Sequence, residues 1–167
     1  MWDLATAEVV FGMKLLSPVT LLKWADHKKV NHNIAYELVI GIGNNLNQGM
    51  FVYDSERMQW TLKLKPYQFP PSGGLIRTFN CVDLSVDKVF VYVGTSSGEV
   101  MVFRRDTQVF RSVIPVCTNG LHDLVVLPDE TIICGGGDGA LKRLRGRDIA
   151  WQNVVEVSTV RLCMVFV

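Results

Sequence analysis

Apolar residues along this chain occur in short runs that are bounded by glycine, proline, asparagine or aspartate. Residues 60–65, Trp-Thr-Leu-Lys-Leu-Lys, alternate strictly between apolar and polar, which is typical of a strand with one exposed face. Clusters such as residues 44–49 and 66–74 are rich in turn-forming residues. No stretch sustains the 3.6-residue period of an amphipathic helix. The pattern predicts an all-β chain with very little helix.

One pattern of strand, glycine-bounded turn and strand occurs twice, at residues 91–103 and 132–144. Four positions correspond at a spacing of 41 residues: Gly94 with Gly135, Gly98 with Gly139, Val100 with Leu141, and Phe103 with Leu144. Self-similarity at about 40 to 45 residues is typical of the blades of a WD40-type β-propeller. The Trp-Asp dipeptide that ends the third strand of such a blade has counterparts at Trp2-Asp3, Tyr53-Asp54, Phe103-Arg104 and Leu144-Arg145.

These spacings predict three blades, roughly at residues 14–65, 75–113 and 120–157, with a partial blade at each end. In the first blade we expect strands at 19–25, 37–43, 50–54 and 60–65, a polar loop at 26–33 and a turn at 44–49. Residues 160–167 resemble an inner strand of a further blade. Propellers have about four to eight blades, so we expect an incomplete ring, either a fragment or a ring completed by another chain.

Composition narrows the classes of function. The chain has 167 residues, 49% hydrophobic and 20% charged, with a formal net charge of +1. This near-neutral balance favours neither nucleic acid nor an anionic membrane as a partner. Its four cysteines have no CxxC spacing, and we interpret Cys81 and Cys134, which lie in apolar strand-like surroundings, as reduced core residues. No signal peptide or membrane span is indicated, which predicts a soluble intracellular protein.

No pattern indicates catalysis, a cofactor or a metal. Gly41-Ile42-Gly43 lacks the third glycine and the following helix of a dinucleotide fingerprint, and we interpret it as a blade turn. The glycine-rich run at 135–139 lacks the Lys-Ser/Thr of a P-loop, so a turn is expected there too. His27 and His32 have no cysteine neighbours, and His122 has no nucleophile in a recognisable motif.

Loops at the blade edges are the candidate sites for binding a protein partner. The residues chosen lie in the loops at 26–33, 44–49 and 66–74 and in the basic run at 142–147: Lys28, Lys29, Asn45, Asn47, Tyr67, Phe69, Lys142, Arg143, Arg145 and Arg147. The basic run has three interpretations: a solvated strand end, a contact with an acidic partner surface, or a nuclear localisation or RNA-binding signal. No aromatic residues are interleaved with it, which argues against nucleic acid.

The run from Gly74 through Val93-Gly94-Thr95-Ser96-Ser97-Gly98-Glu99-Val100 resembles a blade of the WD-repeat family of cilia- and flagella-associated protein 52. The resemblance continues through Arg104-Arg105-Asp106-Thr107 and the glycine-rich run of the next blade, and it covers residues 75–145 best. It implies a non-catalytic scaffold without cofactors in the axoneme of motile cilia and flagella. Its implied partners are tubulin and other inner proteins of the doublet microtubule lumen, with no nucleic acid or membrane. The alternative is a WD-repeat adaptor in a soluble cytoplasmic or nuclear complex.

Overall fold

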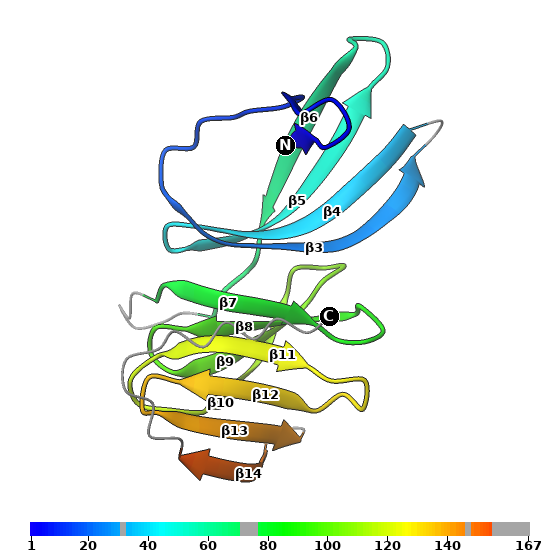
Figure 1. Ribbon diagram of the computed structural model, residues 1–167. Helices are drawn as coiled ribbons and strands as arrows, with labels where there is room; N and C mark the ends of the chain where they lie inside the picture. The colour runs from blue at the N-terminus through cyan, green and yellow to red at the C-terminus, as the bar shows by residue number, and fades with distance from the viewer. Residues whose placement is uncertain (31–32, 71–76, 146–147, 155–167) are drawn as a thin grey trace.

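The computed structural model describes residues 1–30, 33–70, 77–145 and 148–154, and within these ranges it contains strands and turns but no helix. Three four-stranded antiparallel sheets follow one another along the chain (Figure 1). The expected all-β fold with very little helix is confirmed for this part of the chain. A short two-stranded ladder, β1 (Trp2–Asp3) with β2 (Glu8–Val9), precedes the three sheets.

Each of the three large sheets has its strands in sequence order, and we call the sheets the first, second and third blade. The first blade contains β3 (Val19–Val30), β4 (Asn33–Ile42), β5 (Asn45–Asp54) and β6 (Gln59–Pro66). The second contains β7 (Phe79–Leu84), β8 (Phe90–Thr95), β9 (Glu99–Arg104) and β10 (Phe110–Pro115). The third contains β11 (Leu121–Val126), β12 (Ile132–Gly136), β13 (Ala140–Arg145) and β14 (Asp148–Val154).

The strand registers confirm the repeat that the sequence predicts. Gly94 pairs with Val100 across β8 and β9, and Gly135 pairs with Leu141 across β12 and β13. Gly98 and Gly139 close the two turns with φ angles of +81° and +76°, a region that only glycine enters at little cost. The third strands β5, β9 and β13 end at Asp54, Arg104 and Arg145, the positions assigned to the Trp-Asp dipeptide.

A further repeated feature lies on the inner strands, where the sequence shows no pattern. In β3, β7 and β11 the ladder is interrupted by an irregularity at the same place, between Val19 and Leu21, Phe79 and Cys81, and Leu121 and Asp123. Irregularities of this kind bend a strand and increase its twist. The three blades therefore share this backbone irregularity although their side chains at these positions differ.

The first blade departs from the expected strand lengths. The predicted polar loop at 26–33 is wrong for residues 26–30, which continue β3 with Asp26 opposite Glu37, and for Asn33, which begins β4. The predicted turn at 44–49 is also wrong beyond Asn44, because β5 begins at Asn45 and pairs with β4. Local turn propensity is overridden here, since the fully buried Leu46 anchors β5 in the core.

Gly49 illustrates the same correction. It does not form a turn: it lies inside β5, opposite Leu38 of β4 and Leu64 of β6. A Cβ atom at Gly49 would lie 2.9 Å from Leu38 Cδ1, so the absence of a side chain allows Leu38 to pack over the strand.

The remaining bounds differ by a few residues. The strand expected at 76–86 is β7, the outer strand expected at 109–113 is β10, and the outer strand or connector expected at 148–157 includes β14. Pro115 ends β10 on a sheet edge, where its missing N–H costs no ladder hydrogen bond. The strand expected at 160–167 lies outside the described residues.

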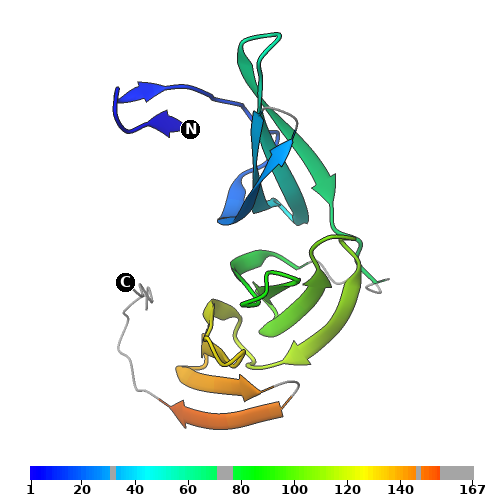
Figure 2. The ribbon, with the colours of Figure 1, turned by 90° about the vertical axis from the view of Figure 1, so that its right-hand side faces the viewer.

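The blades stack face to face, so that each one buries an apolar face of the next (Figure 2). Between the first and second blades, Leu21, Val39, Leu46 and Tyr67 pack against the opposing face that contains Val91, Val93, Met101 and Phe103. Between the second and third, the buried residues include Cys81, Val100, Val102, Leu121, Leu124, Cys134 and Leu144. An apolar sheet face is unfavourable when exposed to water, so burial between stacked blades holds them together.

Candidate interaction surfaces

The first blade is longer than the other two, and this length creates the most prominent surface. Its strands β3 and β4 have 12 and 10 residues, whereas β7 and β8 have six each. At about 3.3 Å per residue, the extra residues carry these strands well past the end of the second blade. Lys28 and Lys29 lie on this extension as exposed strand residues. Lys28 forms an ion pair with Glu37, whereas no ion pair is recorded for Lys29 among the described residues.

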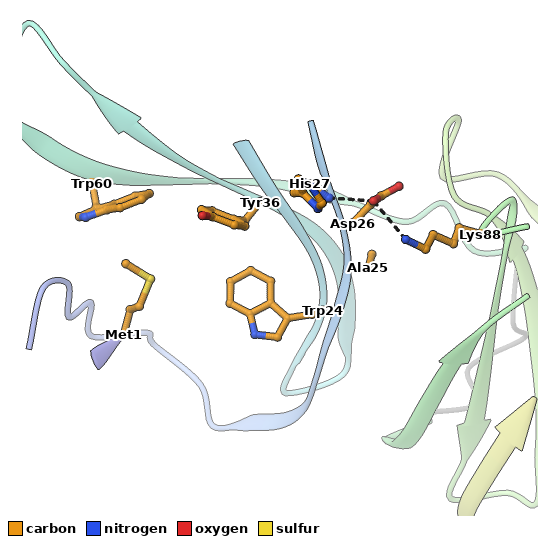
Figure 3. Close-up of a pocket in the computed structure, with 8 residues that line it drawn as sticks. All are labelled: Met1, Trp24, Ala25, Asp26, His27, Tyr36, Trp60 and Lys88. Carbon is orange, nitrogen blue, oxygen red and sulfur yellow. Dashed lines mark hydrogen bonds and ion pairs between the residues drawn. The ribbon is translucent and has the colours of Figure 1, made fainter. Parts of the chain in front are cut away.

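At the base of the extension, charged side chains join the first blade to the second. Glu37 is only 5% exposed, and Arg105 Nη1 of the β9–β10 turn lies 3.5 Å from its Oε2. Arg105 also lies 3.7 Å from Asp26, and Lys88 Nζ approaches Asp26 Oδ1 at 3.1 Å (Figure 3). The backbone N–H of His27 and the ammonium group of Lys88 lower the pKa of Asp26 below its ordinary value. This network joins the base of the extended strands to the second blade.

The aromatic and amide candidates in the first blade and its linker divide into exposed and buried residues. Asn45 is exposed at the start of β5, whereas Asn47 is only 9% exposed. Tyr67 is 3% exposed and packs edge-on against Phe103, with ring centroids 5.2 Å apart. Phe69 is 38% exposed but stacks on Phe79 at 5.4 Å. In this structure Asn47 and Tyr67 are core residues, so they present no surface to a partner.

The basic run at 142–147 does not form one exposed patch. Lys142 is 7% exposed, and its Nζ donates to the carbonyl oxygen of Val116 and lies 3.1 Å from Asp138 Oδ2. Arg143, on the opposite face of β13, binds Asp129 at 2.7 Å. Arg145 is exposed, and Arg147 lies outside the described residues. Alternation along a strand separates these charges, which a linear scan for basic clusters cannot detect. Contact of the exposed candidates with a partner remains a prediction.

No described group of His, Cys, Asp and Glu side chains is arranged so that three or more of them could hold a metal. The run at 135–139 forms the tight turn that was expected, closed by a hydrogen bond of 3.1 Å from the Gly139 N–H to the Gly136 carbonyl oxygen. The Gly41-Ile42-Gly43 segment ends β4 and begins the turn into β5. Within the described part of the chain, no helix is long and apolar enough to cross a membrane.

A pocket of about 530 Å³ is lined by Trp24, Tyr36 and Trp60 of the first blade, together with Met1 and with Lys88 of the second blade (Figure 3). Trp24 and Tyr36 meet edge to face at 5.8 Å, and Tyr36 lies 6.2 Å from Trp60. By register, Trp24 of β3 occupies the position of Leu84 in β7 and Val126 in β11. Both of those residues pack against a neighbouring blade, whereas Trp24 is 54% exposed. The pocket is therefore part of a sheet-stacking face.

Comparison with solved structures identifies the architecture. The β-propeller domain of Cps50 (Swd1) from Myceliophteria thermophila superposes with a TM-score of 0.61 at 10% identity, over 85% of this chain and 43% of that chain. The fold is that of WD40 β-propeller blades. The WD40 repeats of RRP9 agree, with a TM-score of 0.55 at 12% identity over 87% of this chain and 40% of that one. These similarities confirm the fold class, with the chain spanning less than half of each propeller.

The sequence comparison supports the resemblance noted above. Cilia- and flagella-associated protein 52 of Chlamydomonas reinhardtii is 27% identical over 148 residues, which are 87% of this chain and 22% of that protein. The chain thus spans about a fifth of the relative's length. No family model matches the sequence. WD40 propellers and this relative are typically non-catalytic, in agreement with the expectation that the chain is not an enzyme.

Proposed function

We propose that this chain is part of a non-catalytic WD40 scaffold of motile cilia and flagella. In this proposal it is a microtubule inner protein, which binds tubulin and neighbouring inner proteins in the lumen of axonemal doublet microtubules. The observation that carries the proposal is the 27% identity to cilia- and flagella-associated protein 52 over 87% of this chain. The relative's name supplies the ciliary location, and tubulin as a partner follows from the resemblance of residues 75–145 to that family.

The blades supply what a scaffold in a large assembly needs. They are held by stacked apolar faces, so they present their edges and hairpins at fixed positions. The first blade adds the long β3–β4 hairpin, with exposed Lys29, and the third blade presents Arg145 at the end of β13. Basic residues on separate blades suit contacts with several acidic protein surfaces at once, and such multivalent contacts raise avidity.

Fractionation of cilia tests the location. The natural protein, tagged and expressed in motile ciliated cells, is expected to remain with doublet microtubules after detergent has removed membranes and salt has removed loosely bound proteins. A protein that leaves the axoneme in detergent or salt while the doublets stay intact contradicts the proposal. That outcome favours an adaptor of a soluble complex, a setting found among the solved WD40 structures, one of which is the Mitotic Checkpoint Complex (TM-score 0.50, 12% identity).

Charge reversal tests the contact surface. We expect the double variant Lys29→Glu/Arg145→Glu to lower the fraction retained on doublets severalfold, because each exposed cation becomes an anion. The matched control is Arg111→Glu, which reverses an exposed charge on β10 outside the predicted surface. Equal retention of the double variant and the control would show that the two basic positions make no contact.

A further inference from the structure

Three buried polar atoms lie at the junction between the first and second blades without a hydrogen-bond partner among the described residues. They are Tyr67 Oη, Arg105 Nη1 and Gln108 Oε1. Tyr67 and Gln108 are 3% and 2% exposed, so bulk water does not reach them. A buried polar atom without a partner is rare because its lost hydration is not replaced. In the described part of the chain all such side-chain atoms belong to this one junction.

The orientation of Gln108 is fixed by its other contacts. Its Nε2 donates to Gln48 Oε1, to the carbonyl oxygen of Arg105 and, at 3.1 Å, to that of Asp106. A flipped amide would place Gln108 Oε1 against three acceptor oxygens, and that arrangement has no hydrogen bonds. Gln108 Oε1 therefore points away from these groups as an acceptor that needs a donor.

Backbone contacts bring Tyr67 to the same place. The N–H of Gln68 donates to the carbonyl oxygen of Gln108 at 2.9 Å, and the N–H of Tyr67 donates to that of Leu46 at 2.9 Å. Burial raises the pKa of Tyr67, the charge of Arg105 opposes this rise, and the carboxylate of Glu37 adds to it. Arg105 Nη1 is 3.5 Å from Glu37 Oε2, an ion pair that lacks hydrogen-bond geometry.

The three atoms have complementary chemistry. Arg105 Nη1 can only donate, Gln108 Oε1 can only accept, and Tyr67 Oη can do either. An anion would be repelled by Gln108 Oε1 and by the nearby Glu37, and a cation would be repelled by Arg105. A small neutral molecule that donates and accepts satisfies all three, and water is the one that a protein interior commonly holds.

We propose that one ordered water molecule is bound inside this junction. It accepts a hydrogen bond from Arg105 Nη1, donates one to Gln108 Oε1 and takes Tyr67 Oη as its third partner. Three polar partners are the usual number for a buried water. The attachment of the first blade to the second is then partly water-mediated, which joins the linker after β6 to the β9–β10 turn.

A crystal structure of the full chain, at a resolution that shows bound water, tests the site directly. We expect a density peak within about 3.2 Å of at least two of the three atoms. The proposal is overturned if a protein group occupies that position, or if the three atoms are well ordered and no peak lies between them.

The sign of a stability change gives an independent test. If Tyr67 Oη binds the water, Tyr67→Phe lowers the folding equilibrium constant about fivefold, since one hydrogen bond is lost inside the protein. If the hydroxyl has no partner, its removal leaves the constant unchanged or raises it, which overturns the proposal. The control is Tyr53→Phe, whose exposed hydroxyl lies 3.5 Å from Met58 Sδ, and it is expected to change the constant less than about twofold.

Discussion

The two junctions between blades are held by different kinds of interaction. The junction between the second and third blades centres on aliphatic residues and two buried thiols, Cys81 and Cys134. It is joined by single hydrogen bonds to backbone groups. Asn80 Nδ2 donates to the Leu121 carbonyl oxygen at 2.9 Å, and the Val126 N–H donates to Asp83 Oδ2 at 2.9 Å. The junction between the first and second blades adds to its apolar centre a network of charged and amide side chains around Glu37.

The difference suggests how stably packed blades and a projecting hairpin are combined in one chain. The junction between the second and third blades, here called the dry junction, has an apolar centre, and its charged groups Asp83 and Lys142 bind backbone groups. We therefore expect the second and third blades to form one firm unit. The junction of the first blade buries charge, whose attraction is offset by desolvation, and it holds three polar atoms without protein partners among the described residues. We therefore expect the first blade, with its long hairpins, to be the more weakly held part and the one that can adapt to a partner.

The largest expected effect is at the dry junction. Gly98 has a φ of +81°, and a Cβ atom there would lie 2.0 Å from the carbonyl oxygen of Cys117, which is backbone and cannot rotate away. Gly98→Ala should lower the free energy of unfolding by about 3 kcal/mol or more, measured by urea denaturation. Gly135→Ala is the control. Its nearest neighbour would be 4.0 Å away, and its effect is expected to stay within about 1 kcal/mol. Similar losses for both variants would contradict the tight packing of this turn.

The next effect is at the charged junction. Glu37→Gln removes the anion between Arg105 and Lys28 and leaves the partly buried guanidinium group without full compensation. We expect a loss of about 2 kcal/mol in the free energy of unfolding, below the range for fully buried pairs because the Lys28 side chain is 52% exposed. As a control, Asp106→Asn breaks the exposed pair with Arg104 and should cost much less than Glu37→Gln. A loss at Glu37 as small as the control would mean that the network does not hold the blade.

Thiol labelling measures how often the dry junction opens, by comparing its buried cysteines with a half-buried one. Burial raises the pKa of Cys134 to about 12, so at pH 8 it stays a protected thiol, and Cys81 is buried in the same cluster. Iodoacetamide should modify the half-buried Cys117 at least about tenfold faster than Cys81 or Cys134 in the native chain, with the sites resolved by peptide mass spectrometry. Equal rates at the three cysteines would show that the second and third blades separate readily.

The smallest expected effect is the loss of the stabilising contribution of Asp26 at low pH. The pKa of Asp26 is lowered by its backbone hydrogen bond and by Lys88, so its stabilising contribution is complete at neutral pH and is lost as pH falls below its ordinary value of 3.8. Asp26→Asn should cost less than about 1 kcal/mol at pH 7 because the contact is solvent-exposed. The difference from the unmodified chain should shrink toward zero near roughly pH 2. A difference that is constant over this pH range would exclude an ionic origin.

Sequence alone predicted the second and third blades better than the first. The glycines at 94, 98, 135 and 139 report backbone requirements that are local, and the structure confirms their positions. Asn45 and Asp26 lie in stretches with turn or loop composition, yet they are strand residues because tertiary pairing with β4 overrides local propensity. The pair of Glu37 and Arg105 is 68 residues apart in sequence, and only folding brings it together.

The residues predicted for the partner surface differ in their exposure, for the same reason. Loop composition identified Lys29, Asn45 and Arg145, whose side chains are exposed. It could not reveal that Asn47, Tyr67 and Lys142 turn inward, because that depends on which face of a strand meets the neighbouring blade. The alternation of strand residues supplies a signal for such cases once strand bounds are known.

Hydrogen exchange of the full chain, followed strand by strand at increasing urea, tests the central claim that the second and third blades form one firm unit and the first blade is held more weakly. We expect the central strands β8, β9, β12 and β13 to share the highest free energy of opening, and β4 and β5 to open at a lower one. Equal protection of all six strands, or higher protection of β4 and β5, would contradict the account.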